Sequence, residues 1–539
     1  MRVPANEKPW RWAWLLVALY LVAAAASWRR TLIEDEIWAL YLTTRPLAEQ
    51  IQAIRGDLVH PPLWYLVQRA WLAVAGYSDG AAKALPLLVN VPAILFFTAL
   101  ARRVTKHGRL ASFLFAATYL RLAGLPHLVR MYGLILLLAV VALLLWDRWR
   151  ARPSPMRLAG WAAVMALLLY THYFGALLLV AFIAANWLGG PRRGAFLCAA
   201  AGVFGLLAPW LLYVFPVYER RGLAANLAWV DTPLVSLLKL PALFLSWMPT
   251  GWDPFEYRRL PIPVWAALGL AAIAVHVALF VAARKQLRRM STPRANGQEA
   301  SRWLLVSALI VGIPVLLLFA TSLVFTPVLD ARFVAGALPA YGLLLGVLGE
   351  WGGTKGRGIL YAVVVPWVLA SVAVTLPRAR VWPVRAGLEV VSAEFRAGDL
   401  LLADCQVGVQ AWWEWRRLGA SGRLEALRCP ARQWWLPEVT ARDPEALDLG
   451  RVQRVWLVYA DGDQKARLEA VLLSQGFRAG VPPGALRFLA VYVSSEASAS
   501  TSTTMGLRCS LPERMATSSA PTTVGSNLVP TNWRMRSRA

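Results

Sequence analysis

The side chains best suited to chemistry lie in short segments that separate long apolar stretches of the sequence. Two such segments, IEDEIW and GDLVHPPLWY, come early in the chain and contain carboxylates and a histidine. Three later segments, HLVRMYG, YTHYFG and LDARF, contain arginine, histidine and tyrosine side chains. The candidate site residues, in chain order, are Asp35, Glu36, Asp57, His60, Arg130, Tyr132, His172, Tyr173 and Arg332.

Together these side chains suit the transfer of a group from a lipid-linked phosphate. A carboxylate such as Asp35 or Glu36 can act as a general base and take the proton of an attacking hydroxyl. A guanidinium binds phosphate oxygens in pairs, so we expect Arg130 and Arg332 to hold the phosphate. A lipid phosphate is already a good leaving group, so the reaction does not require a separate acid.

Each of these residues, taken alone, also has an ordinary structural interpretation. A single arginine at a helix end commonly extends its charge to the lipid headgroups, and a single histidine is more often structural than a ligand. The set as a whole favours a site. Arg130 and Arg332 lie at helix ends on the side where positive charge is otherwise scarce, and ionisable groups at membrane depth are costly and usually functional.

Long apolar runs make up most of the chain before residue 377. Of 539 residues, 58% are hydrophobic and only 16% are charged, and the mean hydropathy is +0.50. A membrane-spanning helix needs roughly 20 mostly apolar residues. We therefore predict an all-α polytopic membrane protein with about eleven spans. The predicted spans are 12–28, 82–101, 110–125, 131–146, 158–171, 173–189, 195–215, 262–283, 303–325, 333–349 and 358–377.

Positive charge is concentrated in alternate loops. The net charge is +26, and in a membrane protein short loops rich in lysine and arginine are cytoplasmic, so no nucleic-acid partner is expected. The remaining segments, which include 29–81, 216–261 and everything after 377, then lie outside. The chain is predicted to lie in a bacterial inner (plasma) membrane, with its C-terminal part periplasmic or extracellular. In the first outer segment, Leu63–Ala75 is apolar but too short to span and predicts an interfacial helix that begins after Pro61 and Pro62.

The composition changes after residue 377. The segments GDLLLADCQ, RVWLVYA and RFLAVYV predict strands, and DQKARLEAVLLSQG predicts an amphipathic helix that ends at Gly476. Residues 378–493 are therefore predicted to form a small α/β domain after a membrane domain, 1–377. Residues 494–539, rich in Ser, Thr and Arg, are predicted to be disordered.

Five motifs in a fixed order resemble a known family. They are DEIWAL, HPPLWYL, RMYGLILLL, THYFG and ARFVAGALPAYGLLLG. Over about residues 10–377 they look like the GT-C membrane glycosyltransferases, in the branch of protein O-mannosyltransferases and of aminoarabinose or galacturonosyl transferases. The resemblance implies a polyprenyl-phosphate-linked sugar donor and transfer on the outer face of the membrane, with inversion at the sugar.

The resemblance also assigns roles to individual residues. Asp35 matches the family's catalytic aspartate, with Glu36 beside it. The remaining matches are to substrate-binding positions and comprise His60, Arg130, Tyr132, His172, Tyr173 and Arg332; Asp57 is added from its place in the first outer segment. The acceptor could be an envelope lipid such as lipid A, a glycan or a protein. Asp35, Glu36 and Asp57 could also hold a divalent cation.

Two other classes of protein fit the sequence less well. A transporter would be expected to show internal repeats and polar residues at the membrane midplane, whereas the polar residues here cluster at outer loop ends. An O-antigen ligase or polymerase would also use lipid-linked sugars but would not need the acidic pair in the first outer segment.

The charge pattern gives a test of topology. A reporter fused at about residue 385 should signal an external location, because the basic loops 102–109 and 284–302 are predicted to be cytoplasmic. Reporters fused in those two loops serve as controls and should signal a cytoplasmic location. A cytoplasmic signal at 385 would contradict the odd number of spans.

Overall fold

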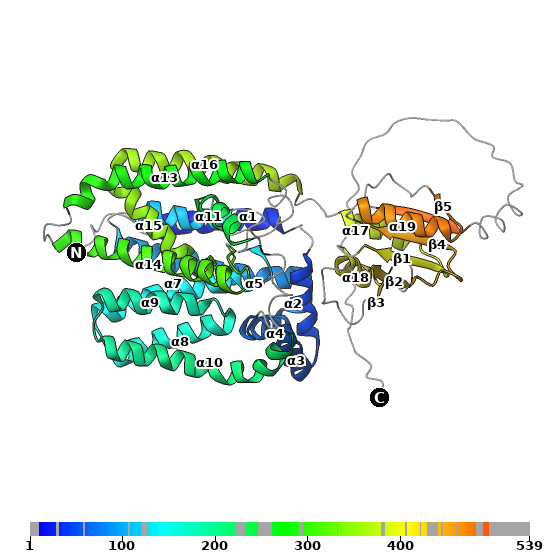
Figure 1. Ribbon diagram of the computed structural model, residues 1–539, viewed down its shortest axis with the longest axis horizontal. Coiled ribbons are helices and arrows are strands. Elements are labelled where there is room, and N and C mark those ends of the chain that lie inside the picture. The colour runs from blue at the N-terminus through cyan, green and yellow to red at the C-terminus, as the bar shows by residue number, and fades with distance from the viewer. Residues whose placement is uncertain are drawn as a thin grey trace, which may run out of the picture.

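The computed structural model shows a bundle of helices followed by a separate α/β unit (Figure 1). The residues that it describes are 10–28, 32–57, 60–105, 108–120, 127–221, 230, 232–245, 261–289, 295–330, 332–378, 383–404, 407–420, 422–427, 440–443, 446–459, 462–480 and 489–494. The predicted disordered tail therefore lies outside the described residues, apart from Ser494.

Each predicted span contains a helix. The elements of the bundle are α1 (Trp10–Ser27), α5 (Asp79–Val104), α6 (Arg109–Leu120), α7 (Tyr132–Ala151), α8 (Pro155–Thr171), α9 (Gly175–Gly189), α10 (Arg193–Arg221), α11 (Pro233–Leu245), α13 (Ile262–Arg289), α14 (Ala295–Val324), η3 (Ala335–Ala337), α15 (Leu338–Trp351) and α16 (Gly353–Arg378). By length and composition, five helices in the described part can cross a membrane, and three shorter ones are apolar. The chain is a multi-pass membrane protein.

Small residues let some of these helices approach closely. A Cβ atom built on Gly346 of α15 would lie 2.5 Å from the Cβ of Ala111 in α6, so only glycine fits at this crossing. At the opposite end of the bundle from the α/β unit, Arg103 of α5 donates to the buried carboxylate of Asp147 in α7 over 2.9 Å. Small-residue contacts and polar links of this kind hold helices together where water is excluded.

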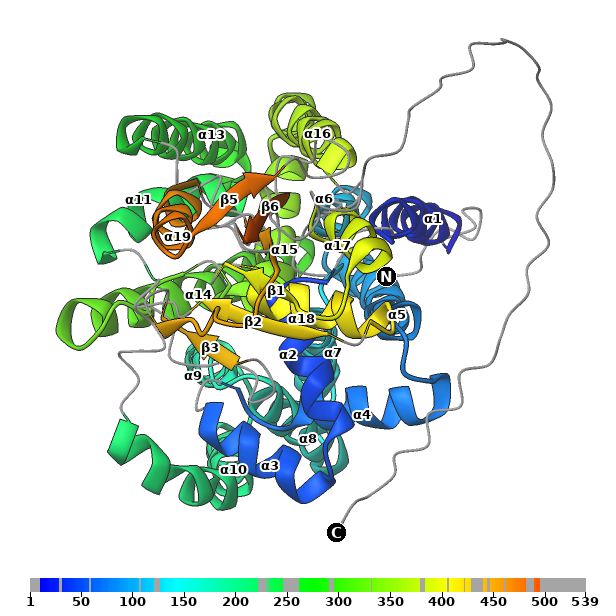
Figure 2. The same cartoon turned by 90° about the vertical axis from the view of Figure 1, so that its right-hand side faces the viewer.

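Three short helices lie across the end of the bundle that faces the α/β unit (Figures 1 and 2). They are α2 (Glu34–Thr44), α3 (Leu47–Asp57) and α4 (Leu63–Ala75). The predicted helix after the proline pair is confirmed, since Pro62 is the N-cap of α4. Arg69 of α4 donates to the Gln50 side chain over 3.2 Å, and Tyr77 donates to the Thr43 carbonyl over 3.1 Å. These bonds fix α4 against the turn between α2 and α3.

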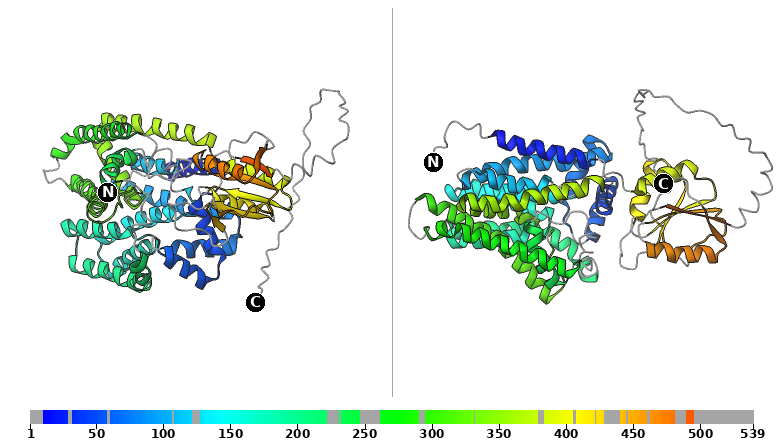
Figure 3. Two further views of the ribbon diagram at one scale, coloured as in Figure 1. Left: turned by 45° about the vertical axis from the view of Figure 1, so that its right-hand side comes forward. Right: turned by 90° about the horizontal axis from the view of Figure 1, so that it is seen from above.

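The α/β unit contains a six-stranded sheet with the order β3-β2-β1-β4-β6-β5. Strands β1 to β4 are parallel, whereas β6 pairs antiparallel with both β4 and β5. Helices α17 and α18 pack on one face and α19 on the other (Figure 3). The bounds are α17 (Pro383–Glu394), β1 (Asp399–Ala403), α18 (Gly408–Arg417), β2 (Arg423–Leu427), β3 (Thr440–Arg442), β4 (Arg454–Val458), α19 (Gly462–Ser474), β5 (Phe477–Gly480) and β6 (Leu489–Ser494).

Helix α18 lies between the sheet and the membrane bundle. Ala411 and Trp415 belong to the core on the sheet face, whereas Trp412 belongs to the core of the bundle. The Trp412 ring meets Tyr41 of α2 edge-on, with 6.0 Å between the ring centroids. Arg417 forms an ion pair with Asp79 at the start of α5. The α/β unit therefore contacts the same helix, α2, that carries the acidic candidates.

The ion pair between Arg417 and Asp79 can be tested by exchanging its charges. Asp79→Arg alone places two cations together and should lower the thermal midpoint of the purified protein. The double variant Asp79→Arg/Arg417→Asp should recover part of that loss, because the new carboxylate pairs with the new arginine but also lies beside Glu414. Because the pair is partly exposed, the coupling should be about 0.2–1 kcal/mol. Equal effects of Asp79→Arg in the wild-type and Arg417→Asp backgrounds would show that the contact does not form.

Candidate active site

The candidate residues meet at the end of the bundle that faces the α/β unit. They come from the start of α2, the residue before the proline pair, the 127–130 turn before α7, the end of α8 and the segment before η3. Most of them are buried or half-buried. Direct contacts join Arg130 to Asp35 and His60, and His60 to His172. These side chains therefore lie together at this end of the bundle, and their role as a site stays a prediction.

Glu36 joins two of these segments. Its side chain is fully buried, and its two carboxylate oxygens accept backbone N–H groups from Ile33 over 2.8 Å and from Val129 over 2.6 Å. The first bond caps the start of α2, where the helix leaves N–H groups without partners and favours negative charge. The second bond ties α2 to the 127–130 turn. Glu36 therefore has a structural role, because it fixes the start of α2 to the 127–130 turn.

Arg130 bridges the acidic helix and the proline-pair segment. Its Nη1 donates to the Asp35 carbonyl oxygen over 3.0 Å, and its Nη2 lies 3.4 Å from His60 Nε2. A guanidinium can only donate, so His60 Nε2 is the acceptor and its ring is neutral in this contact. The Asp35 side chain is half-buried, unlike that of Glu36 beside it.

His172 adds a second imidazole to the cluster. Its ring meets that of His60 edge-on at 5.5 Å between centroids. The Phe174 backbone N–H donates to His172 Nδ1 over 3.2 Å, so the neutral ring carries its proton on Nε2. That nitrogen is buried and has no hydrogen-bond partner among the described residues. Burial, followed by the nearby His60, Arg130 and Arg332, holds the pKa of His172 well below 6.5.

Arg332 supplies a second guanidinium. Its Nε lies 3.3 Å from Asp330 Oδ1, and its backbone N–H donates to the same oxygen over 2.8 Å. Burial opposes its charge, but Asp330, Tyr132 and Asp35 outweigh burial and raise the pKa of Arg332 above its usual value. Arg332 is therefore permanently charged. Tyr132 and Asp35 lie close enough to interact with that charge electrostatically.

An apolar pocket opens beside these two groups. His172 and Arg332 form its polar end, and most of its other lining residues are apolar side chains from α7, α8, α9 and the segment around η3. Phe174 and Phe333 stack across it with 4.3 Å between ring centroids. A Cβ on Gly336 would lie 2.6 Å from Leu178 Cδ1, so glycine lets this wall of the pocket pack closely against Leu178. We call this feature the apolar slot.

The structure separates two of the predicted residues from this cluster. The Tyr173 hydroxyl accepts the indole N–H of Trp210 in α10 over 2.8 Å, which places Tyr173 on the side of α10. The Asp57 side chain lies outside the described residues. Among the described residues, no three histidine, cysteine, aspartate or glutamate side chains are grouped to hold a metal ion. The sequence missed Phe174 and Phe333 as site residues, although each lies next to a predicted one. It marked Asp330 in the LDARF segment but assigned it no role.

Comparisons with known proteins give no family model and no curated protein that matches the chain. Among solved structures, the chain is similar to ArnT from Cupriavidus metallidurans bound to undecaprenyl phosphate, with 16% identity and a TM-score of 0.41 over 90% of this chain and 99% of that one. It is also similar to the archaeal oligosaccharyltransferase AglB from Archaeoglobus fulgidus, in complex with an inhibitory peptide and a dolichol-phosphate, with 12% identity and a TM-score of 0.38 over 74% of this chain and 63% of that one. Both are GT-C fold membrane glycosyltransferases.

The environment of His172 gives a pH prediction. Its ring should remain neutral as the pH falls through 6.5, because burial and nearby cations oppose a further positive charge. The unfolded chain takes up that proton near pH 6.5, so this residue should make the protein less stable as the pH falls below that value. NMR of labelled histidine rings should show no titration of His172 near pH 6.5, with the signal assigned by its loss in His172→Asn. A midpoint at or above 6.5 would contradict the burial argument.

Proposed function

We propose that this protein is a membrane glycosyltransferase that moves a sugar from a polyprenyl-phosphate donor to an acceptor hydroxyl at the outer end of the bundle. The observation that carries the proposal is that His172 and Arg332 line the apolar slot while Arg130 and Asp35 act on them electrostatically from beside it. A slot that ends in a guanidinium and a buried N–H donor suits an amphiphile with an anionic headgroup.

The donor would lie with its prenyl chain in the slot and its phosphate at Arg332. This arginine stays charged over the whole physiological range, and Asp330 fixes its orientation. His172 would donate its Nε2–H to a phosphate oxygen, which would give that buried donor a partner. An unsatisfied buried donor costs about 1–3 kcal/mol, so this contact would favour binding.

The reaction would proceed by direct displacement. The acceptor oxygen forms a bond to the anomeric carbon while the Asp35 carboxylate takes the hydroxyl proton. The bond between the anomeric carbon and the phosphate oxygen breaks, and its electron pair leaves with the polyprenyl phosphate. Arg332 and the Nε2–H of His172 would stabilise the charge that develops there, as oriented donors commonly do. Attack from the face opposite the phosphate would invert the anomeric centre.

Asp35 and Glu36 would have different roles in this reaction. Both oxygens of Glu36 accept backbone N–H groups, whereas Asp35 is half-buried and its backbone is held by Arg130. Successive side chains on a helix point about 100° apart, so the two carboxylates cannot face the same group. Glu36 would position the helix, and Asp35 would be the base.

We further propose the side of the membrane on which transfer occurs and the classes of acceptor and sugar. The transfer would occur on the periplasmic or extracellular side of a plasma membrane, where the charge pattern puts this end of the bundle. The acceptor would be an envelope lipid, a glycan or a protein, and the sugar a hexose or pentose. A divalent cation would assist only if it bound near Asp35, and an assay with and without chelator tests that point.

The two carboxylates can be distinguished by substitution. Asp35→Asn should lower the transfer rate by about 10²–10⁴ while donor binding and thermal stability stay near those of the wild type. Glu36→Gln removes one of two backbone acceptors, so it should lower stability by about 1–3 kcal/mol. Transfer from radiolabelled polyprenyl-phosphate sugars and thermal unfolding would be measured at matched amounts of folded protein. Normal turnover in Asp35→Asn would exclude it as the base.

A further inference from the structure

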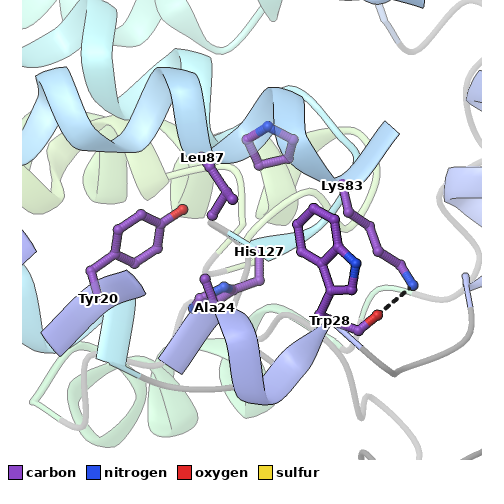
Figure 4. Close-up of a pocket in the computed structure, with 7 residues that line it drawn as sticks. Tyr20, Ala24, Trp28, Lys83, Leu87 and His127 are labelled. Atoms are coloured by element: carbon purple, nitrogen blue, oxygen red, sulfur yellow. Dashed lines mark hydrogen bonds between the residues drawn. The ribbon is translucent and has the colours of Figure 1, made fainter. Parts of the chain in front are cut away.

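A second pocket lies between the outer ends of α1 and α5 (Figure 4). Tyr20, Ala24 and Trp28 line it from α1 and the residue after that helix, Lys83 and Leu87 line it from α5, and His127 lines it from the 127–130 turn. None of the side chains assigned to the transfer reaction lines this pocket. It is therefore separate from the apolar slot.

The pocket has polar groups at one end and apolar surroundings. The Lys83 ammonium donates to the Trp28 carbonyl oxygen over 2.9 Å, which places the charge at the end of α1 (Figure 4). The Tyr20 and His127 rings lie 5.4 Å apart, and the Tyr20 hydroxyl accepts from Asn90 over 2.9 Å. Aromatic rings beside a cation are typical of the level at which lipid headgroups meet the hydrocarbon.

The outer faces of both helices are apolar and exposed. Val22 of α1 is 69% exposed and Leu88 of α5 is 53% exposed. In a membrane these faces contact lipid tails, so a lipid can reach the pocket from the bilayer. A ligand with an apolar tail and a charged head fits both parts.

The charges around the pocket favour an anionic head. Lys83 is the lysine among the residues that line the pocket, and its ammonium lies beside the Trp28 carbonyl oxygen. The carboxylates nearest Lys83 are Asp79, one helical turn away, and Glu414 of α18. Both are within ion-pair distance of Arg417, so the charges of Arg417 and Lys83 together balance those of the two carboxylates.

We propose that this pocket binds the phosphate headgroup of an anionic lipid from the outer leaflet. Lys83 and the His127 ring would contact the phosphate, while Trp28 and Leu87 pack against the start of the tails. The pocket lies behind the 127–130 turn, whose Val129 N–H holds Glu36 and whose Arg130 holds Asp35. A bound lipid would therefore support the turn from the side opposite the reaction. The proposal is independent of the transfer reaction, since it concerns binding alone.

The test measures lipid binding to the full-length purified protein by native mass spectrometry. The probes are a short-chain phosphatidylglycerol, the matching zwitterionic phosphatidylcholine, and farnesyl phosphate. Lys83→Glu reverses the rim charge, Leu87→Trp fills the pocket, and Lys83→Arg keeps the charge. The matched control is Arg193→Glu, because Arg193 is another exposed cation beside a tryptophan, 5.4 Å from the ring of Trp187.

We expect wild type, Lys83→Arg and Arg193→Glu to retain phosphatidylglycerol in preference to phosphatidylcholine. Lys83→Glu and Leu87→Trp should each weaken that binding at least about tenfold, or about 1.4 kcal/mol. Lys83→Glu also loses the hydrogen bond to the Trp28 carbonyl, so binding is compared at matched amounts of folded protein, and Leu87→Trp, which keeps that bond, separates loss of the pocket from loss of stability. If the two variants lose farnesyl phosphate rather than phosphatidylglycerol, the pocket takes a prenyl phosphate, which would overturn the assignment to an outer-leaflet lipid. Unchanged binding of both anionic lipids in Lys83→Glu and Leu87→Trp, or an equal loss in Arg193→Glu, would overturn the proposal.

Discussion

The arrangement of the site depends on one buried carboxylate, that of Glu36. An ionised carboxylate removed from water is very costly unless its oxygens accept hydrogen bonds. Here two backbone N–H groups donate to it: that of Ile33, three residues before Glu36 in the sequence, and that of Val129, 93 residues after it. Because the two donors belong to different segments, the same side chain caps the start of α2 and fixes the distance of that helix from the 127–130 turn. Asp35 and Arg130 each lie next to one of these bonded residues, so their separation follows from the Glu36 contacts.

Helix α2 is held from both sides as a result. The 127–130 turn holds its first turn, and Trp412 of α18 packs on Tyr41 near its end. The α/β unit therefore covers the helix that carries the acidic residues. A covering domain of this kind limits how far α2 can tilt, and a tilt would move Asp35 relative to Arg332. This gives the sheet a structural role at the site even though none of its strands contributes a candidate side chain.

Local features of the sequence predicted much of the fold. The spans, the helix after Pro62, the helix that ends near Gly476 and the strands β1, β4 and β6 all follow from apolar length, alternation or turn residues. The sheet order, helix α18 and strand β5 did not, because strand neighbours and contacts between domains depend on residues far apart in the chain. The partners of Glu36 are of the same kind. A sequence shows that a carboxylate follows a span but not which backbone groups will meet it.

Residues that are adjacent in the sequence can also serve different parts of a structure, which sets a limit on motif-based site prediction. His172 has an extended backbone, with φ of −159° and ψ of 131°, and successive side chains in extended chain point to opposite sides. His172 consequently faces His60 and the apolar slot, whereas Tyr173 faces Trp210 of α10. Asp35 and Glu36 diverge for the corresponding reason in a helix. In both pairs the motif marks the correct position in the chain, and backbone geometry decides which of the two side chains can reach the ligand.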